Sequence, residues 1–224
     1  MTHLETELQQ LKNNLTEMWA LVKTQLSKAK LALINEDKDL AREVISVEKR
    51  VNAFELSIDK DSENIFALFN PVAVDLRLVL AIIKINNNLE RQGDCAKGIA
   101  QFVIDIDGLF DKNLLEITRI VDMFNENIVM LTELIEAFEK EDGIIARKIF
   151  KRDELLDIIN VKSTSIIAGY IRNHIDNAEQ ALQILSIIRK LERAGDHSKN
   201  IAEEIIFYTE AKVLKHGIKE KKKG

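Results

Sequence analysis

Residues 89–94 read LERQGD, and residues 191–196 read LERAGD. Each copy continues with a lysine, an isoleucine and an alanine at the same distances from its aspartate. The glutamate and the aspartate of a copy stand four residues apart, so they share one face of a helix. Two like charges at this spacing weaken a helix by about 0.2–0.5 kcal/mol. A sequence that places such an unfavourable pair twice, in matched surroundings, indicates that a site has been duplicated.

The chain around the two copies is expected to be helical. Apolar residues recur at three- and four-residue steps almost throughout. Only 8 glycines and one proline are present, fewer than turn-rich β folds need. Pro71 marks the end of one helix, because the residue before a proline avoids helical geometry. The six expected helices lie at about 4–34, 40–69, 72–106, 114–138, 144–171 and 175–213.

These helices divide into two groups of three, and each group ends with the helix that carries one copy of the motif. Long helices joined by short turns pack as an antiparallel bundle. The sequence therefore predicts an all-α protein of six long helices, arranged as two tandem, pseudo-symmetric three-helix bundles. The first bundle is expected in residues 1–108 and the second in residues 109–224.

Composition excludes several classes of protein. The formal net charge of −5 gives no electrostatic reason to expect nucleic-acid binding. The one cysteine, Cys95, cannot form an internal disulfide and fits a reducing compartment. The N-terminus is polar, and no apolar run approaches the roughly 20 residues that cross a bilayer. We therefore expect a cytoplasmic protein without membrane insertion, whose basic run at 219–223 is a disordered tail.

Each motif places a glycine directly before its aspartate. Gly93 and Gly195 both fall inside a predicted helix, where glycine costs about 0.5–1 kcal/mol relative to alanine. Two explanations are open: another helix packs closely there, or bulk is removed beside the carboxylates so that a ligand can approach. Other acidic pairs at the same spacing, such as Asp39 and Glu43, lack this setting and are expected to be solvated charges.

The paired carboxylates are candidate ligands for a cation. One helix rarely completes a hard-cation site alone, so a neighbouring helix must contribute. Oxygen-rich ligation suits magnesium, manganese, calcium or iron, and bridging carboxylates hold two ions close together. Arg91 and Arg193 are competitors, since pairing with these acids leaves no vacancy for a metal. The candidates on the preceding helices are Glu48, Asn52, Glu55 and Asp59 in the first unit, and Asp153 and Asp157 in the second.

A histidine follows the aspartate of the second copy. A neutral imidazole adds a nitrogen ligand to many metal sites. His197 points about 100° around the helix from Asp196, however. We therefore expect an exposed side chain that is not a ligand.

The doubled motif, with NPVAVDLR at residues 70–77 leading into the first copy, resembles the PhoU family of phosphate-signalling regulators. The resemblance extends from about residue 7 to residue 213. It implies two three-helix bundles, often as a homodimer, with clustered multivalent metal ions on the carboxylates, iron or zinc first and magnesium or manganese as alternatives. It further implies negative regulation of phosphate uptake and of the phosphate-starvation response. The implied partners are the ATPase of the phosphate ABC transporter and the phosphate sensor histidine kinase.

The resemblance also assigns metal ligands to individual positions. The motif ligands are Glu90 and Asp94 in the first copy, and Glu192 and Asp196 in the second. The preceding helix of each unit adds an acid, and the set is Glu48, Asp153 and Asp157. The chain departs from the family at Gln92 and Ala194, where an isoleucine is common.

Other functions were weighed against this one. The sequence shows no glycine-rich phosphate loop, no Walker lysine and no Ser-His-Asp grouping, which favours a protein that is not an enzyme. A di-iron enzyme or storage protein needs Glu-x-x-His, and no glutamate here has a histidine three residues later. A related regulator of low-affinity phosphate carriers and a metal-free helical scaffold stay open as alternatives.

Overall fold

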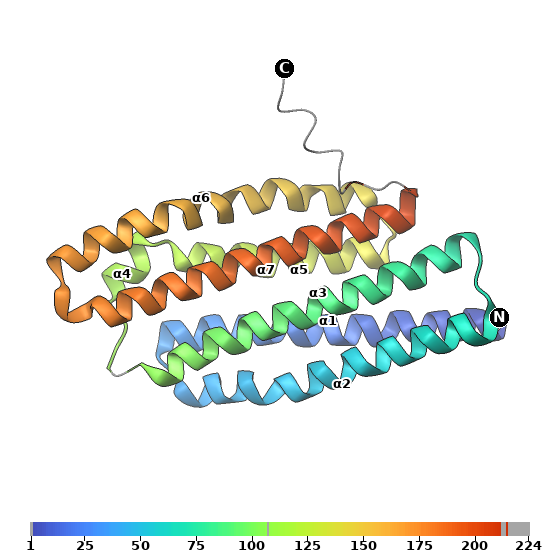
Figure 1. The fold of residues 1–224 in the computed structure, drawn as a ribbon, viewed down its shortest axis with the longest axis horizontal. Helices are drawn as coiled ribbons and strands as arrows, with labels where there is room; N and C mark the ends of the chain where they lie inside the picture. Colours follow the sequence, from blue (N-terminus) through green and yellow to red (C-terminus); the bar gives the residue numbers. More distant parts are fainter. Residues whose placement is uncertain (1, 107, 212–213, 215–224) are drawn as a thin grey trace, which may run out of the picture.

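The structure is a computed structural model that describes residues 2–106, 108–211 and 214. This part of the chain contains helices and no strand. The helices run side by side along the long axis of the molecule (Figure 1). Their bounds are α1 His3–Asn35, α2 Lys38–Phe69, α3 Ala73–Asp105, α4 Lys112–Ile117, α5 Ile120–Glu139, α6 Gly143–Asn173 and α7 Ala178–Glu210. A single 3-10 turn, Ile175–Asn177, precedes α7.

Local sequence signals set most of the helix ends. Thr2 caps α1, and its hydroxyl accepts from the backbone N–H of Glu5 in a capping box. Asp37 and Asp142 cap α2 and α6, because their side-chain carboxylates accept from backbone N–H groups of the first helical turn. α2 ends at Phe69 and is followed by Asn70, whose φ of 45° lies in the left-handed region that terminates helices. The predicted turns at 35–39, 70–71 and 140–143 are therefore correct.

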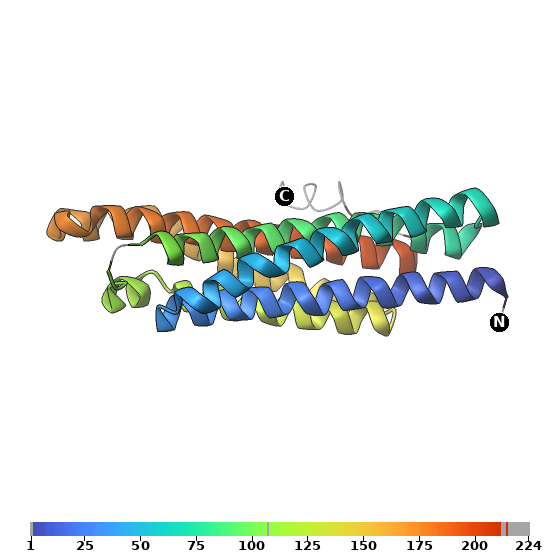
Figure 2. The same cartoon turned by 90° about the horizontal axis from the view of Figure 1, so that it is seen from below.

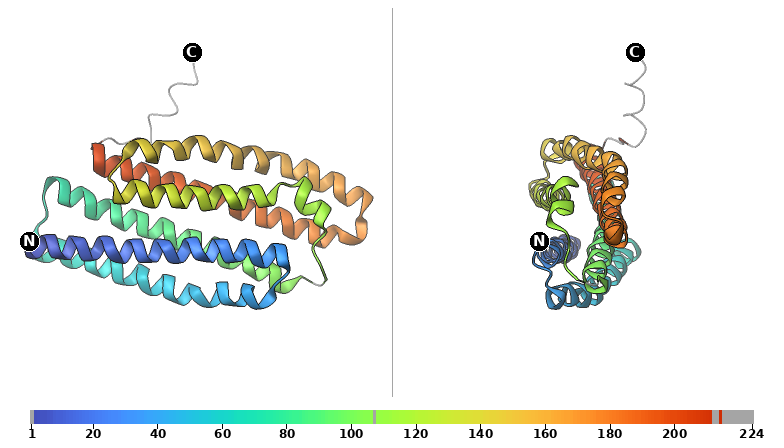
Figure 3. Two further views of the ribbon diagram at one scale, coloured as in Figure 1. Left: turned by 180° about the vertical axis from the view of Figure 1, so that it is seen from behind. Right: turned by 90° about the vertical axis from the view of Figure 1, so that its left-hand side faces the viewer.

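The helices pack as two groups that lie side by side. α1, α2 and α3 contact one another, as do α5, α6 and α7. The groups join through α3 against α7 and α1 against α5. Figure 2 shows these two pairs as separate layers, and the end-on view in Figure 3 shows the two groups beside each other. The connection between α3 and α4 contains the predicted boundary at residue 108, and the division into units there stays a prediction.

The predicted helix 114–138 is broken, which corrects the sequence-based assignment. α4 and α5 are separated at Thr118 and Arg119, and Arg119 adopts a left-handed φ of 56°. The Thr118 hydroxyl donates to the backbone oxygen of Leu114 at 2.7 Å, which satisfies a group at the end of α4. Arg119 also contacts Asp122 at 2.7 Å. The apolar pattern continues across the break, so it gives no signal there.

The last helix also differs from its predicted bounds. It begins at Ala178, because residues 175–177 form the 3-10 turn, and it ends at Glu210. The predicted end at Val213 and the basic run at 219–223 lie outside the described residues. Within the described ranges, no helix combines the length and the apolar character needed to span a bilayer.

Candidate metal centre

Antiparallel packing of α2 against α3 gathers three acids of the first unit. Glu48 lies in α2, and Glu90 and Asp94 lie four residues apart on α3. One carboxylate oxygen of each residue lies within 4.8 Å of the others. We call these three residues the first cluster. Its oxygens converge closely enough for one cation to contact all three side chains.

The Glu48 side chain is the unusual member of the first cluster. It is only 4% exposed, and neither of its carboxylate oxygens has a hydrogen-bond partner. Oε2 of Glu90 is likewise buried without a hydrogen-bond partner, and Nε of Arg91 lies 3.4 Å from it. Buried carboxylates without partners are strongly unfavourable, because burial removes water and supplies nothing in return. A multivalent cation bound between them would satisfy these oxygens.

The pKa values in the first cluster reflect burial and the closeness of the three carboxylates. Burial raises the pKa of the Glu48 carboxyl, and the charge of Asp94 raises it further. Burial also raises the pKa of Glu90, and Asp94 again adds to the effect. Lys97 and Arg91 act in the opposite direction but do not reverse it. The arrangement therefore disfavours three ionised carboxylates unless positive charge is added.

The motif glycines explain how the acids of the preceding helices come so close. A Cβ on Gly93 would stand 3.3 Å from Val51 and 3.6 Å from Oε2 of Glu48. A Cβ on Gly195 would stand 2.9 Å from Oδ1 of Asp153 and would clash with Leu156. The helices therefore pack closely at each glycine, as the first of the two explanations requires, and a carboxylate oxygen is among the nearest atoms in both cases. The approach of a ligand, which is the second explanation, stays a prediction.

The remaining candidates of the first unit differ in position. Glu55 lies near the first cluster, and burial together with the charges of Asp59 and Asp94 raises its pKa. Asp59 accepts a hydrogen bond from Asn86 at 2.9 Å, so one of its oxygens is already satisfied. Asn52 is exposed on α2. Glu55 is therefore an additional acid whose charge acts on this cluster, since it raises the pKa of Glu90.

The acids of the second unit come together differently. Nζ of Lys199 lies 2.5 Å from Oδ2 of Asp153 and 2.6 Å from Oδ1 of Asp196. Burial raises the pKa of Glu192, and the charges of Asp196 and Asp157 add to the effect. Asp157 is exposed on α6. We call these four acids the second cluster; in the described residues, only the first cluster has three convergent acidic oxygens.

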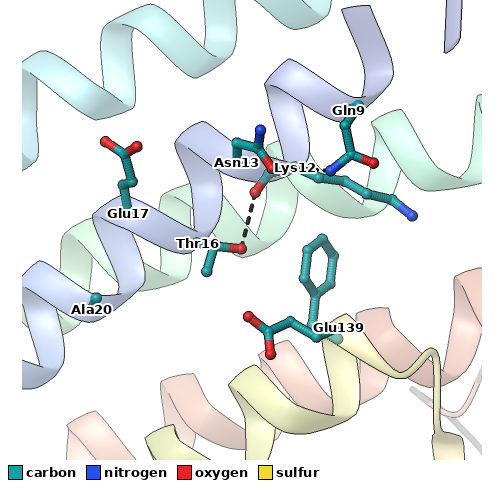
Figure 4. A pocket seen from close by; sticks show the side chains of 8 residues that line it. Gln9, Lys12, Asn13, Thr16, Glu17, Ala20 and Glu139 are labelled. Atoms are coloured by element: carbon teal, nitrogen blue, oxygen red, sulfur yellow. Dashed lines mark hydrogen bonds between the residues drawn. The ribbon is translucent and has the colours of Figure 1, made fainter. Parts of the chain in front are cut away.

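The basic residues named as competitors lie beside the first cluster. Nε of Arg91 is 3.4 Å from Oε2 of Glu90, an ion pair that is longer than an ordinary hydrogen bond. Arg91 and Arg193 also line a hollow of about 360 Å³ between α3 and α7, together with Lys97 and Lys190. A larger hollow of about 520 Å³ lies between α1 and the end of α5 and contains no motif carboxylate (Figure 4).

Comparison with known proteins identifies the family. The family model described as the PhoU domain matches residues 15–103 and 120–205. The chain belongs to the PhoU family. The phosphate-specific transport system accessory protein PhoU homolog 1 of Thermotoga maritima is 31% identical over 214 residues, which cover 95% of this chain and 91% of that protein. Escherichia coli PhoU, which bears the same accessory-protein name, is 31% identical over 94% of this chain and 86% of its own.

Solved PhoU structures confirm the predicted fold class. The crystal structure of PhoU from Pseudomonas aeruginosa matches with a TM-score of 0.87 at 30% identity, over 94% of this chain and 100% of that one. PhoU from Streptococcus pneumoniae matches with a TM-score of 0.84 at 28% identity, over 95% and 99% of the two chains. The all-α PhoU-like architecture predicted from the doubled motif is therefore correct.

The two departures from the PhoU motif face each other in this structure. Gln92 is 2% exposed, and its Nε2 donates to the backbone oxygen of Ala194 and to Oγ of Ser198, both at 2.8 Å. A larger residue at 194 would crowd the space that the Gln92 side chain occupies between α3 and α7. These two hydrogen bonds join α3 to α7 across the helix crossing.

Two features of the site were not predicted. His197 is half-buried, not exposed, and its Nδ1 lies 2.9 Å from Oδ1 of Asn88 on α3. Burial and the neighbouring Arg193 lower the pKa of His197. Gln25 of α1 reaches Gly93 and also has a buried oxygen without a partner. The signal for Gln25 is a polar residue three positions after Val22 on an otherwise apolar stripe.

Proposed function

We propose that this PhoU-family protein is a regulator, not an enzyme, that acts in the cytoplasm to restrain phosphate uptake and the phosphate-starvation response. Its relatives are named as accessory proteins of the phosphate-specific transport system, which supports the choice of pathway. The proposed partners are the ATPase of the phosphate ABC transporter and the sensor histidine kinase. We further propose that the protein acts as a homodimer.

The metal-binding part of the proposal depends on one observation. Glu48 presents two buried, unpartnered carboxylate oxygens to Glu90 and Asp94. We propose that the first cluster binds multivalent cations, with iron or zinc clusters first and magnesium or manganese as alternatives. Carboxylate oxygens bind any of these ions. The three acids therefore restrict the charge and the size of the bound ion, but they do not select one element.

Metal analysis tests the cation site. Protein purified without chelator should contain bound metal, and Asp94→Asn should remove most of it. Asp39→Asn is a matched control, because Asp39 is an exposed acid with Glu43 four residues later on the same helix. Its metal content should equal that of the wild type. Equal metal content in Asp94→Asn and wild type would show that the first cluster is not the site.

Expression in the source cell tests the regulatory part. Deletion of the gene should raise expression of phosphate-starvation genes in phosphate-rich medium, and the wild-type gene should restore repression. Unchanged expression would contradict the proposal and would favour a scaffold or a regulator of low-affinity phosphate carriers.

Co-purification of the transporter ATPase or of the sensor kinase with the tagged protein then tests the partners. Light scattering of the purified protein tests the homodimer.

A further inference from the structure

The ammonium group of Lys199 lies between the two motif-related acids of the second cluster. It contacts Oδ2 of Asp153 on α6 and Oδ1 of Asp196 on its own helix, at 2.5 and 2.6 Å. Asp153 is 2% exposed; Lys199 supplies a positive charge at its Oδ2, while its Oδ1 is buried without a hydrogen-bond partner. Charge-assisted hydrogen bonds of this length are among the strong polar contacts of proteins.

The first unit has a lysine at the same place in its motif, but that lysine is arranged differently. Lys97 lies three residues after Asp94, as Lys199 lies three residues after Asp196. Its Nζ is 3.6 Å from Oδ1 of Asp94, and both side chains are more than two-fifths exposed. It makes no ion pair with Glu48, whose oxygens stay without a hydrogen-bond partner. The two clusters therefore differ in one contact: Lys199 contacts the buried acid of the preceding helix in the second cluster, and Lys97 does not do so in the first.

A metal ion and the Lys199 ammonium would compete for the same oxygens. An ion held by Asp153 and Asp196 would stand within a few ångströms of the ammonium, and two cations so close repel each other. Lys199 must therefore leave before a metal enters. The buried carboxylate of Asp153 makes this displacement unfavourable, because it holds the ammonium by a short contact.

We propose that Lys199 is an internal cation that closes the second cluster, so that the two units of this chain differ in metal binding. The first cluster takes multivalent ions, and the second cluster is neutralised by the chain itself. The doubled motif thus carries one metal centre and one structural ion pair. This inference depends on the cation binding proposed above for the family site, and it assigns to Lys199 the difference between the two halves.

Titration with Mn²⁺ alone tests the inference. The full-length protein is stripped with chelator, and bound Mn²⁺ per chain is measured by equilibrium dialysis for wild type and Lys199→Met. Methionine keeps a long, flexible side chain and removes the charge. Lys199→Met should bind more Mn²⁺ per chain than wild type. Lys97→Met is the matched control and should show no such gain.

The location of the gained ion is tested by a second change. Asp153→Asn added to Lys199→Met should abolish the gain, since it removes the buried ligand. Each variant also needs a thermal melt with and without Mn²⁺. Lys199→Met should melt below wild type in chelator, because Asp153 loses its partner, and Mn²⁺ should raise its melting temperature more than that of wild type.

Two variants that retain Lys199 test the inference if Lys199→Met does not fold. Asp196→Asn should leave Mn²⁺ binding at the wild-type level, whereas Asp94→Asn should lower it. Equal losses in the two variants would overturn the inference, because both clusters would then hold metal. No gain in a folded Lys199→Met would overturn it as well.

Failure of the parent proposal gives a different result. If the first cluster binds nothing, Asp94→Asn and wild type bind Mn²⁺ equally. The difference between wild type and Lys199→Met is still measured in that case, and a gain there supports the role of Lys199.

Discussion

Each motif glycine lets a carboxylate of the neighbouring helix approach the backbone of the motif helix. The approach is tighter at Gly195, where a Cβ would clash with Leu156 and stand 2.9 Å from Asp153, than at Gly93, where the nearest atoms are 3.3 Å away. Neither glycine has a positive φ. These positions therefore require glycine for lack of space, not for backbone conformation. The space at each position determines how much a substitution destabilises the protein.

Gly195→Ala is expected to destabilise the protein more than Gly93→Ala. A methyl at 195 must displace Leu156 and the Asp153 carboxylate, and overpacking of this kind costs about 1–3 kcal/mol. Alanine regains about 0.5–1 kcal/mol of helix propensity at either position. Gly169→Ala in α6 is the control, since its Cβ would meet no atom within 4 Å, and it should stabilise. Urea unfolding of the three variants gives the order; a Gly195→Ala protein as stable as Gly169→Ala would contradict it.

Glu48→Gln is expected to stabilise the metal-free protein at neutral pH. The folded state raises the pKa of Glu48 above its ordinary value of 4.5, so folding favours the protonated carboxyl. Stability from this group is present below pH 4.5 and is lost as the pH rises through the folded pKa. The Glu48→Gln side chain does not titrate, so the variant does not lose this stability as the pH rises. The melting temperature of Glu48→Gln in chelator should exceed that of wild type by a margin that grows from pH 5 to pH 7.

The same substitution should weaken metal binding, so stability and function change in opposite directions. With Mn²⁺ in excess, wild type should gain melting temperature and Glu48→Gln should gain little. A margin that is constant with pH would show that Glu48 does not titrate in this way. An equal gain in Mn²⁺ would show that it is not a ligand.

At the scale of the helices, α3 and α7 form one of the two contacts between the groups, and a buried polar residue lies in it. Gln92 crosses from α3 to Ala194 and Ser198 on α7, and these hydrogen bonds fix how the motif helices lie against each other. Buried polar contacts of this kind define register, because a shift along the helix leaves the amide without partners.

A double-mutant cycle between Gln92→Leu and Ser198→Ala should show coupling of about 1 kcal/mol, the usual value of one net hydrogen bond. Both residues are buried, so water cannot replace the lost partner. The control cycle pairs Gln92→Leu with Ser46→Ala, an exposed residue of α2. Unfolding in urea supplies the free energies. Coupling within error of the control cycle would show that the contact contributes nothing to stability.

Much of the helical arrangement was predictable from periodicity, and the exceptions have local causes. The ends of α1, α2 and α6 follow capping residues and Pro71, which act within a few positions. The break at Arg119 was not predictable, because the apolar pattern is continuous there and a left-handed arginine leaves no mark in the sequence. The meeting of Gln92 with Ser198 depends on how the two groups dock, which no local pattern reports.

The candidate site was also predictable in part, from spacing within a helix and from antiparallel packing. Spacing within one helix placed Glu90 beside Asp94, and antiparallel packing placed Glu48 near them. From the sequence, both copies are predicted to bind metal in the same way. The structure shows that Lys199 contacts two acids and Lys97 only one, a difference that arises from side-chain packing between helices.

At the scale of the whole molecule, a duplicated fold holds two clusters in related surroundings but with different charge compensation. α3 and α7 lie against each other, so both motif helices belong to one continuous contact region between the groups. The central claim is that the first cluster, with the two buried Glu48 oxygens that lack hydrogen-bond partners, holds multivalent ions.

Anomalous diffraction from a crystal of the untreated protein, collected on both sides of the iron and zinc edges, tests this claim most directly. The account predicts anomalous density within ligand distance of Glu48, Glu90 and Asp94, and none between Asp153 and Asp196, where Lys199 lies. A first cluster without anomalous density, in crystals soaked with Mn²⁺ as well as in untreated ones, would contradict the account.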